Sequence, residues 1–303
     1  MDLPEPDTCS TANTTTTAAA GADTHEVFNV GTELADFNAF EQDTALVEAV
    51  VREGAAWAVP ALSTFGALTG SATYQELGVL ANRHAPELDT HDRFGRRVDL
   101  VRFHPAYHTL MQTAIAHGLH ASPWSAPQAG AHVARAAHCY LHTQVDAGHG
   151  CPVTMTFAAV PALRHTPALA ALWEPRITAR AYDPRNVPDA QKAGVTIGMA
   201  MTEKQGGSDV RANTTRAHPV GLEGPGQAYE LVGHKFFVSA PMCDAFLVLA
   251  QAPRGLSCFL LPRWRPDGSK NAMQVLRLKR KMGNASNASS ETELRGALAW
   301  RVG

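Results

Sequence analysis

The sequence is poor in cysteine, and none of its cysteines is arranged as a C-x-x-C pair. An odd number of thiols without paired spacing does not describe a disulfide framework, and it favours a reducing compartment. We therefore expect a cytoplasmic protein. Cys151 precedes a proline and could be reactive, but the pattern favours an ordinary buried thiol. The five cysteines are Cys9, Cys139, Cys151, Cys243 and Cys258.

Long hydrophobic runs and a basic leader are also missing. No apolar run approaches the roughly 18 residues that a membrane-spanning helix needs. The chain opens with Met1–Asp7, which lacks the basic and apolar regions of a signal peptide. Its formal net charge is -2, so the chain has no global basic footprint for nucleic acid. These absences predict a globular protein without a membrane partner.

What remains is the composition of a folded chain. With 303 residues, of which 45% are hydrophobic and 18% charged, it can bury one large core or two smaller ones. Residues 1–23 are a polar Thr- and Ala-rich stretch, which predicts a disordered tail. Apolar positions recur at helical spacing in residues 24–193 and in short alternating runs in residues 194–303. We predict an α+β multidomain protein, in which an N-terminal all-α domain precedes a small β-barrel or sandwich domain.

The helical part is predicted to begin after Asp43, a suitable N-cap residue. The following segments are expected in order: a helix ending near Gly66 or Gly70, a helix stopping before Pro86, a turn at Arg93–Arg97 between short strands, a helix from His104-Pro105, a helix over Ala129–Val145, and an apolar segment Cys151–Ala158 leading into another helix. Pro175 and Asp183–Pro188 are expected to mark the linker. The expected strands are Val195–Met201, Tyr229–Val232, Lys235–Ser239, Phe246–Ala250, Ser257–Leu261, Met273–Leu278 and Glu291–Leu294.

One stretch, Gly198–Val210, has the pattern of a ligand-binding loop. Its apolar strand runs into Thr202-Glu203, and a glycine pair, Gly206-Gly207, then precedes Ser208. Glycines allow close approach of the backbone, and a turned loop can aim several N–H groups at one phosphate. It is neither a Rossmann nor a Walker pattern. An ordinary glycine turn in a β domain is the competing interpretation.

Two blocks carry a resemblance to a known family. Met201-Thr-Glu-x-x-Gly-Gly-Ser-Asp209 and Gly233-His-Lys-Phe-Phe-Val-Ser239 resemble flavin-binding segments of the acyl-CoA dehydrogenase family, with Phe237 where the family usually has Trp. Further blocks resemble the AidB-like branch, which acts in the response to DNA alkylation. These blocks are Thr24–Asn29, Val101–Pro105, Cys151–Ala158, Asn213–Ala217 and Gly283–Ala288.

The resemblance implies FAD as cofactor and oxidation of the CH–CH group of an acyl-CoA. The residues that it implies for cofactor binding are Met199, Ala200, Met201, Thr202, Gly207, Ser208, Phe237, Val238 and Ser239. Thr202 matches the hydroxyl that bonds the pyrimidine edge of the flavin, and Ser239 matches the group near its reactive nitrogen. Phe237 is placed to stack on the ring.

The resemblance also implies what this chain leaves out. In the family, the carboxylate that removes the α-proton belongs to a C-terminal helical domain, which also completes the flavin site and the subunit contacts of homo-oligomers. We expect this domain to be absent, so no catalytic residue is assigned, and Glu203 is interpreted as structural. In AidB-like relatives a further C-terminal region binds double-stranded DNA. The alternative function is therefore a DNA-associated response protein with little dehydrogenase activity.

Two other patterns are weaker. His104 and His108, like His138 and His142, have the i, i+4 spacing of metal ligands, but neither pair has an acidic partner nearby, so no metal site is predicted. The run Arg277–Lys281 is the one dense basic segment. It is typical of a solvated strand edge, with phosphate or nucleic-acid contact as the alternative.

Overall fold

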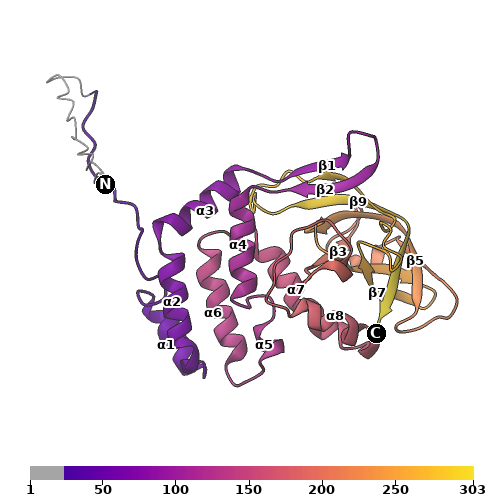
Figure 1. Ribbon diagram of the computed structural model, residues 1–303, viewed down its shortest axis with the longest axis horizontal. Coiled ribbons are helices and arrows are strands. Elements are labelled where there is room, and N and C mark those ends of the chain that lie inside the picture. The colour runs from indigo at the N-terminus through magenta and orange to yellow at the C-terminus, as the bar shows by residue number, and fades with distance from the viewer. Residues whose placement is uncertain (1–23) are drawn as a thin grey trace, which may run out of the picture. The chain divides into compact units, whose positions relative to one another are not determined.

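The computed structural model describes residues 24–303, so the predicted tail 1–23 lies outside the described residues. The chain divides into two units, 1–34 and 35–303. In the described part of the first unit, Val27, Phe28, Val30 and Leu34 are exposed. In the second unit the helices come first and the strands of the large sheet follow, which is the order that the sequence predicts (Figure 1).

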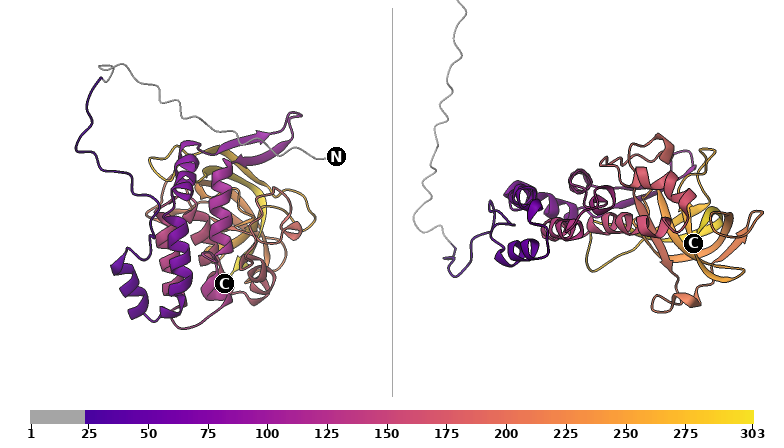
Figure 2. Two further views of the ribbon diagram at one scale, coloured as in Figure 1. Left: turned by 60° about the vertical axis from the view of Figure 1, so that its left-hand side comes forward. Right: turned by 90° about the horizontal axis from the view of Figure 1, so that it is seen from below.

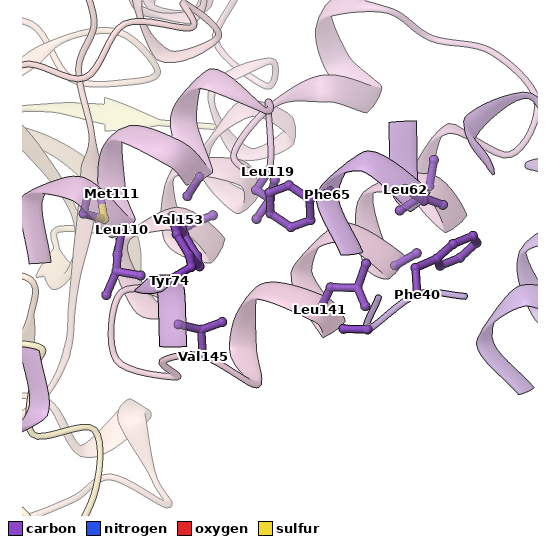
Figure 3. Close-up of a cluster of buried hydrophobic side chains, with 14 of the residues drawn as sticks. Phe40, Leu62, Phe65, Tyr74, Leu110, Met111, Leu119, Leu141, Val145 and Val153 are labelled. Carbon is purple, nitrogen blue, oxygen red and sulfur yellow. The ribbon is translucent and has the colours of Figure 1, made fainter. Parts of the chain in front are cut away.

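The earlier helices pack around a core of their own, whereas α8 and the second half of α7 pack against the strands. Asp43 caps α1 by accepting a hydrogen bond from the Leu46 N–H at 2.9 Å, and His104 caps α4 in the same way through Ala106. Figure 3 shows the core, in which Phe65 and Leu141 lie among other buried aliphatic and aromatic side chains. The helices are α1 (Thr44–Arg52), α2 (Val59–Thr69), α3 (Ala72–Arg83), α4 (Pro105–Ala116), α5 (Ser122–Ser125), α6 (Ala131–Thr143), α7 (Gly150–Leu163) and α8 (Pro167–Ile177).

Two details of the helical prediction are wrong. The segment Cys151–Ala158 does not lead into a helix but lies inside α7, because Pro152 falls in the first turn, where no N–H is needed. Pro175 does not mark the linker but lies in the last turn of α8, two residues before the helix ends at Ile177. The linker therefore starts only at Thr178.

The strands form a closed barrel with one strand outside the closure. The sheet order is β3-β5-β4-β6-β7-β9-β8, and a further antiparallel pairing of β5 with β9 closes it. β3 and β4 share the space between β5 and β6, since each pairs with both. The strands are β3 (Ile197–Thr202), β4 (Arg216–Pro219), β5 (Ala228–Ser239), β6 (Ala245–Ala252), β7 (Gly255–Pro262), β8 (Met273–Leu278) and β9 (Ser289–Val302). Figure 2 gives two further views of these strands.

The sequence pattern predicts two strands, Tyr229–Val232 and Lys235–Ser239, where the structure has the single strand β5, and it does not predict β4. β5 continues through Gly233, where a Cβ would lie 2.7 Å from the Thr215 Cα, so glycine is needed for close approach of β4's leading residues and not for a turn. β4 is only four residues long and contains a charged residue, a histidine and a proline. It has no apolar run that a pattern search would detect.

A hairpin from the helical part covers the edge of β8. Strands β1 (Glu87–His91) and β2 (Arg97–Arg102) flank the predicted turn at Arg93–Arg97. Arg97 Nη2 donates to the Val275 carbonyl at 2.6 Å, and the Val275 N–H donates to Asp99 Oδ2 at 3.4 Å. Two side chains thus occupy backbone groups of the outermost strand. Among residues 24–303, no helix is both long and apolar enough to cross a membrane.

Candidate functional site

The two flavin-type blocks lie side by side. Met201-Thr202 ends β3 and Phe237–Ser239 ends β5, and the two strands pair antiparallel, with Met199 opposite Ser239, Ala200 opposite Val238 and Thr202 opposite Phe237. A bulge between Ala200 and Thr202 shifts the register. Gly198 permits the close packing of β3, because a Cβ there would lie 2.7 Å from both the Ser239 carbonyl oxygen and the Phe246 ring. Segments almost 40 residues apart in sequence therefore form one surface.

The side chains of these blocks divide between two faces. Ala200 and Val238 are buried in the barrel core, so only their backbone groups are available to a ligand. The other five are more accessible: Met199, Met201, Thr202 and Ser239 are half-buried, with both methionines also packed against the hydrophobic core, and Phe237 is 38% exposed. We call these five residues the ledge. The structure thus brings together an aromatic ring, two hydroxyls and two thioethers at the paired ends of β3 and β5.

The glycine loop follows directly from the ledge. Gly207 and Ser208 are both exposed. A Cβ on Gly207 would lie 3.7 Å from the Thr202 methyl group, so the loop returns close to the end of β3. The next turn begins with Asp209, whose carboxylate caps Val210–Ala212 by accepting from the Arg211 N–H at 3.1 Å. Both predicted cofactor residues of the loop are therefore accessible.

Glu203 anchors this loop from inside the barrel. Its buried carboxylate accepts hydrogen bonds from the N–H and hydroxyl groups of Thr214 and Thr215 and from the Gln205 amide, at 2.5 to 2.9 Å. Burial alone would raise the pKa of Glu203, but these donors outweigh it and hold the pKa well below its usual range. A carboxylate with every lone pair engaged is a poor base, which agrees with the structural role predicted for Glu203.

A buried lysine completes the anchor. Lys235 Nζ lies 3.2 Å from Glu203 and donates to the Leu249 carbonyl at 2.6 Å, and both charged side chains are fully buried. Burial lowers the pKa of Lys235, and the Glu203 charge opposes that shift. This pair joins β3, β5 and β6 just beneath the ledge. Sequence reasoning missed it because the two residues are 32 positions apart.

Cys151 lies beside the ledge rather than in the core. It is half-buried at the start of α7, so the predicted buried thiol is only partly confirmed. Burial raises its pKa, while Lys281 and hydrogen bonds to Ser239 and Asn287 oppose that rise. Lys281 donates to the Asn287 carbonyl at 2.7 Å. The block Gly283–Ala288 therefore meets the block Cys151–Ala158 next to Ser239, a contact that no sequence pattern indicated.

A second buried polar network, centred on Asp146, contacts the block Gly283–Ala288. Asp146 accepts from Asn82 and Ser286, each at 2.7 Å, and from the ring of His149 at 2.9 Å. The other ring nitrogen of His149 contacts His142, whose far nitrogen lies 2.7 Å from the hydroxyl oxygen of Tyr74. A Cβ on Gly148 would lie 2.0 Å from Ser286 Oγ. The helical layer and the barrel loop are therefore joined by side-chain hydrogen bonds.

The histidine pairs do not form metal sites. His108 contacts the Tyr182 hydroxyl at 2.9 Å, while His104 stacks on His84. His138 hydrogen-bonds the Ala134 carbonyl, whereas His142 belongs to the network above. Over residues 24–303 no group of three His, Cys, Asp or Glu side chains has the arrangement of a metal site.

The basic run is neutralised only in part. β8, which carries Arg277, pairs with β9 among the described residues, as a strand edge would. Arg277 and Lys279 both contact the Glu291 carboxylate, at 2.7 and 3.0 Å, and Lys279 also lies 3.1 Å from the centre of the Phe236 ring. One carboxylate therefore faces two of the four cations of this segment.

Comparison with known families agrees with this geometry. Residues 29–184 match the family described as adaptive response protein AidB N-terminal domain, and residues 198–297 match the acyl-CoA dehydrogenase middle domain. The first match covers about half of the chain and the second contains the ledge. The chain belongs to the AidB branch of the acyl-CoA dehydrogenase family. The family that the sequence blocks suggested is thereby confirmed.

Relatives of this family share most of the chain. AidB of Escherichia coli (strain K12) is 50% identical over 282 residues, which make up 92% of this chain and 51% of that protein. The crystal structure of Caenorhabditis elegans ACDH-11 in complex with C11-CoA has a TM-score of 0.78 at 27% identity, and it covers 95% of this chain and 50% of its own. The chain thus spans about half the length of these relatives.

A more distant structure shows the fold alone. The acyl-CoA dehydrogenase of Bacillus anthracis, solved as a complex with FAD, has a TM-score of 0.53 at 17% identity. The match covers 80% of this chain and 37% of that one. The helical layer followed by a β-barrel is therefore an acyl-CoA dehydrogenase architecture, as the sequence predicts.

Proposed function

We propose that this chain binds FAD on the ledge and serves an acyl-CoA dehydrogenase-type oxidation of the CH–CH group of an acyl-CoA. The observation that carries the proposal is the antiparallel pairing of β3 with β5, which brings Thr202, Phe237 and Ser239 together. The Thr202 side chain is half-buried, and its hydroxyl can both donate to and accept from a ligand. The FAD complex of a protein with the same fold supports this choice of cofactor.

The residues present fit a flavin. Phe237 offers an exposed aromatic face on which a flat ring can stack. Thr202 and Ser239 supply hydroxyls for the polar edge of the ring, and such hydrogen bonds tune its electron affinity. The N–H groups around Gly207 and Ser208 are suited to a pyrophosphate. When bound, FAD supplies a two-electron acceptor, while the chain's own residues hold and orient it.

The acyl-CoA substrate is proposed from the family and from the relative solved with C11-CoA. The proton-removing group is not Glu203, because its carboxylate is buried, fully hydrogen-bonded and held at a low pKa. Family resemblance assigns that role to a carboxylate of a further helical domain. The contribution proposed for this chain is therefore to bind the flavin and to form one wall of the substrate site.

Loading with FAD tests the proposal directly. The purified chain is titrated with FAD, and binding is followed by quenching of flavin fluorescence and by the visible spectrum. Thr202→Val removes only a hydroxyl, and we expect the affinity to fall about tenfold, the effect of roughly 1.4 kcal/mol for one ligand hydrogen bond. Thr109→Val, on an exposed position of α4, is the matched control and should bind as the parent does. A chain that cannot be loaded, or equal affinities of the two variants, would contradict the proposal.

The match to the AidB family also supports the alternative function, association with DNA in the alkylation response. Against it, two of the four cations of the densest basic segment share the Glu291 carboxylate, and the net charge of the chain is -2. A titration of a short duplex at rising salt concentration decides between the two. Binding that weakens steeply with salt would support the alternative, since phosphate contacts release counterions.

A further inference from the structure

A cavity of about 480 Å³ lies away from the ledge, between α8 and the connection from β7 to β8. Three tryptophans line it, Trp173 from α8, Trp264 from the connection and Trp300 from β9, and Leu172 stands at its rim with 56% of its surface exposed. No ledge residue contributes to the lining. Ligand sites of small molecules have volumes of roughly 300 to 1,000 Å³, so this cavity is of suitable size.

The unmatched polar groups of this cavity are donors. The indoles of Trp57 and Trp124, elsewhere in the fold, each donate to a carbonyl. The indole N–H groups of the three cavity tryptophans are not among the buried unpartnered groups of residues 24–303, so they are open to solvent or to a ligand. Arg265, which also lines the cavity, has a buried Nε without a partner among the described residues. Buried donors without acceptors are costly, and a ligand that brings acceptors removes that cost.

The acidic groups of the cavity are already engaged. Asp189 pairs with Arg176, and Asp267 accepts from the N–H and hydroxyl of Ser269 at 2.9 and 2.6 Å. Both carboxylates of the lining are therefore engaged, whereas the buried Nε–H of Arg265 stays without a partner among the described residues.

We propose that this cavity is a binding site for a small aromatic carboxylate. The indole rings stack on the ring of the ligand, and aromatic pairs of this kind prefer flat partners. The Arg265 guanidinium and the free indole N–H groups bind the carboxylate, for which arginine is the preferred donor. The site is separate from the ledge, so it does not depend on flavin binding.

The test uses three probes of one shape on the intact chain. 2-Naphthoate carries a negative charge, 2-naphthamide is neutral, and 2-naphthylmethylamine is positive at neutral pH. Binding is measured by calorimetry, and the contact is located by saturation transfer from the protein to the naphthalene protons. We expect 2-naphthoate to bind at least tenfold more tightly than the amide, and the amine not to bind.

Matched variants locate the site. Leu172→Glu places a negative charge at the rim and should abolish binding of 2-naphthoate, whereas Leu222→Glu, at a position 76% exposed between β4 and β5, should leave it unchanged. Arg265→Gln should remove the preference for the carboxylate over the amide. Because Leu172 and Leu222 are both exposed, both variants should fold, which circular dichroism verifies. Equal affinity for the three probes, no binding of any of them, or binding that survives Leu172→Glu would overturn the proposal.

Discussion

Two buried carboxylates, Glu203 and Asp146, are kept ionised by different kinds of hydrogen-bond partner. Glu203 lies in the barrel wall, where backbone N–H groups, hydroxyls and Lys235 satisfy it. Asp146 lies where the helices meet the barrel loop, and its partners include the ring of His149, which contacts His142 in turn. In each case burial alone would raise the pKa of the carboxyl group, and the hydrogen bonds outweigh it and lower the pKa.

The difference lies in which partners titrate. The N–H, hydroxyl and amide donors to Glu203 carry no titrating charge, so these hydrogen bonds do not depend on the protonation of an imidazole. Imidazoles do change charge between about pH 5 and 8. One set of tautomers satisfies the junction: Tyr74 donates to His142 Nε2, His142 Nδ1 donates to His149 Nε2, and His149 Nδ1 donates to Asp146. The junction thus contains a buried imidazole, His142, whose pKa is lowered, whereas most donors to Glu203 are uncharged.

The largest expected effect comes from Glu203. Glu203→Gln removes the charge opposite Lys235 and leaves a buried ammonium group unpaired, so we expect the free energy of unfolding to fall by about 3 to 5 kcal/mol. Glu293→Gln is the matched control, because Glu293 pairs with Arg295 on the surface and should cost no more than about 1 kcal/mol. Urea unfolding at pH 7 measures both. Similar midpoints for the two variants would show that the barrel pair is not an anchor.

A smaller effect is expected at the junction. Asp146→Asn keeps the size of the side chain but turns an amide group toward the donors of Asn82, Ser286 and His149, so we expect a loss of about 2 to 3 kcal/mol. Asp89→Asn, whose parent residue pairs with Arg102 at the surface, is the control. If Asp146→Asn lowered the free energy of unfolding as much as Glu203→Gln, the two carboxylates would be equally essential to the fold, and the expected difference would be contradicted.

The smallest effect is a change in pH dependence. Burial, together with His149, lowers the pKa of His142 well below its usual value. The unfolded chain then takes up this proton first, so the stability due to neutral His142 is complete above about pH 6.5 and is lost as the pH falls below that value. His142→Gln should make unfolding less pH-dependent between pH 6.5 and 5, by at most about 1.4 kcal/mol per pH unit.

Unfolding curves across this range, with the exposed His91→Gln as control, measure the slope. The other histidines with lowered pKa, His108, His117, His120 and His138, are present in both proteins, so the difference isolates His142. The carboxyl group of Asp146, whose pKa is lowered, loses its contribution only below about pH 3.9. Identical slopes for the two variants would contradict a junction that depends on neutral histidine.

Local signals in the sequence predicted most of the elements. Asp43 and Pro105 mark helix starts by their own chemistry, and short apolar runs mark β6 and β7. For two elements, β5 and α8, these signals gave a wrong prediction. Gly233 resembles a break between strands, although it serves a close contact with Thr215, and Pro175 resembles a linker although the last turn of α8 accommodates it.

The candidate site was predicted through the family resemblance and only in part through the residues. Strand alternation alone would have placed Ala200 and Val238 on the face opposite Met199 and Ser239, as the structure does. The polar networks of Glu203 and Asp146 could not be predicted, because their partners come from distant segments that only the folded chain brings together. The assignment of the nine residues to cofactor binding stays a prediction until FAD loading is measured.

The hairpin formed by β1 and β2 has a consequence for how copies of this chain behave together in solution. An outermost strand with free backbone groups is a template onto which another chain can add a strand. On β8, Arg97 and Asp99 occupy the carbonyl and the N–H of Val275. A neighbouring molecule would have to displace two charged side chains before it could pair there, so the hairpin protects the barrel against aggregation through this edge.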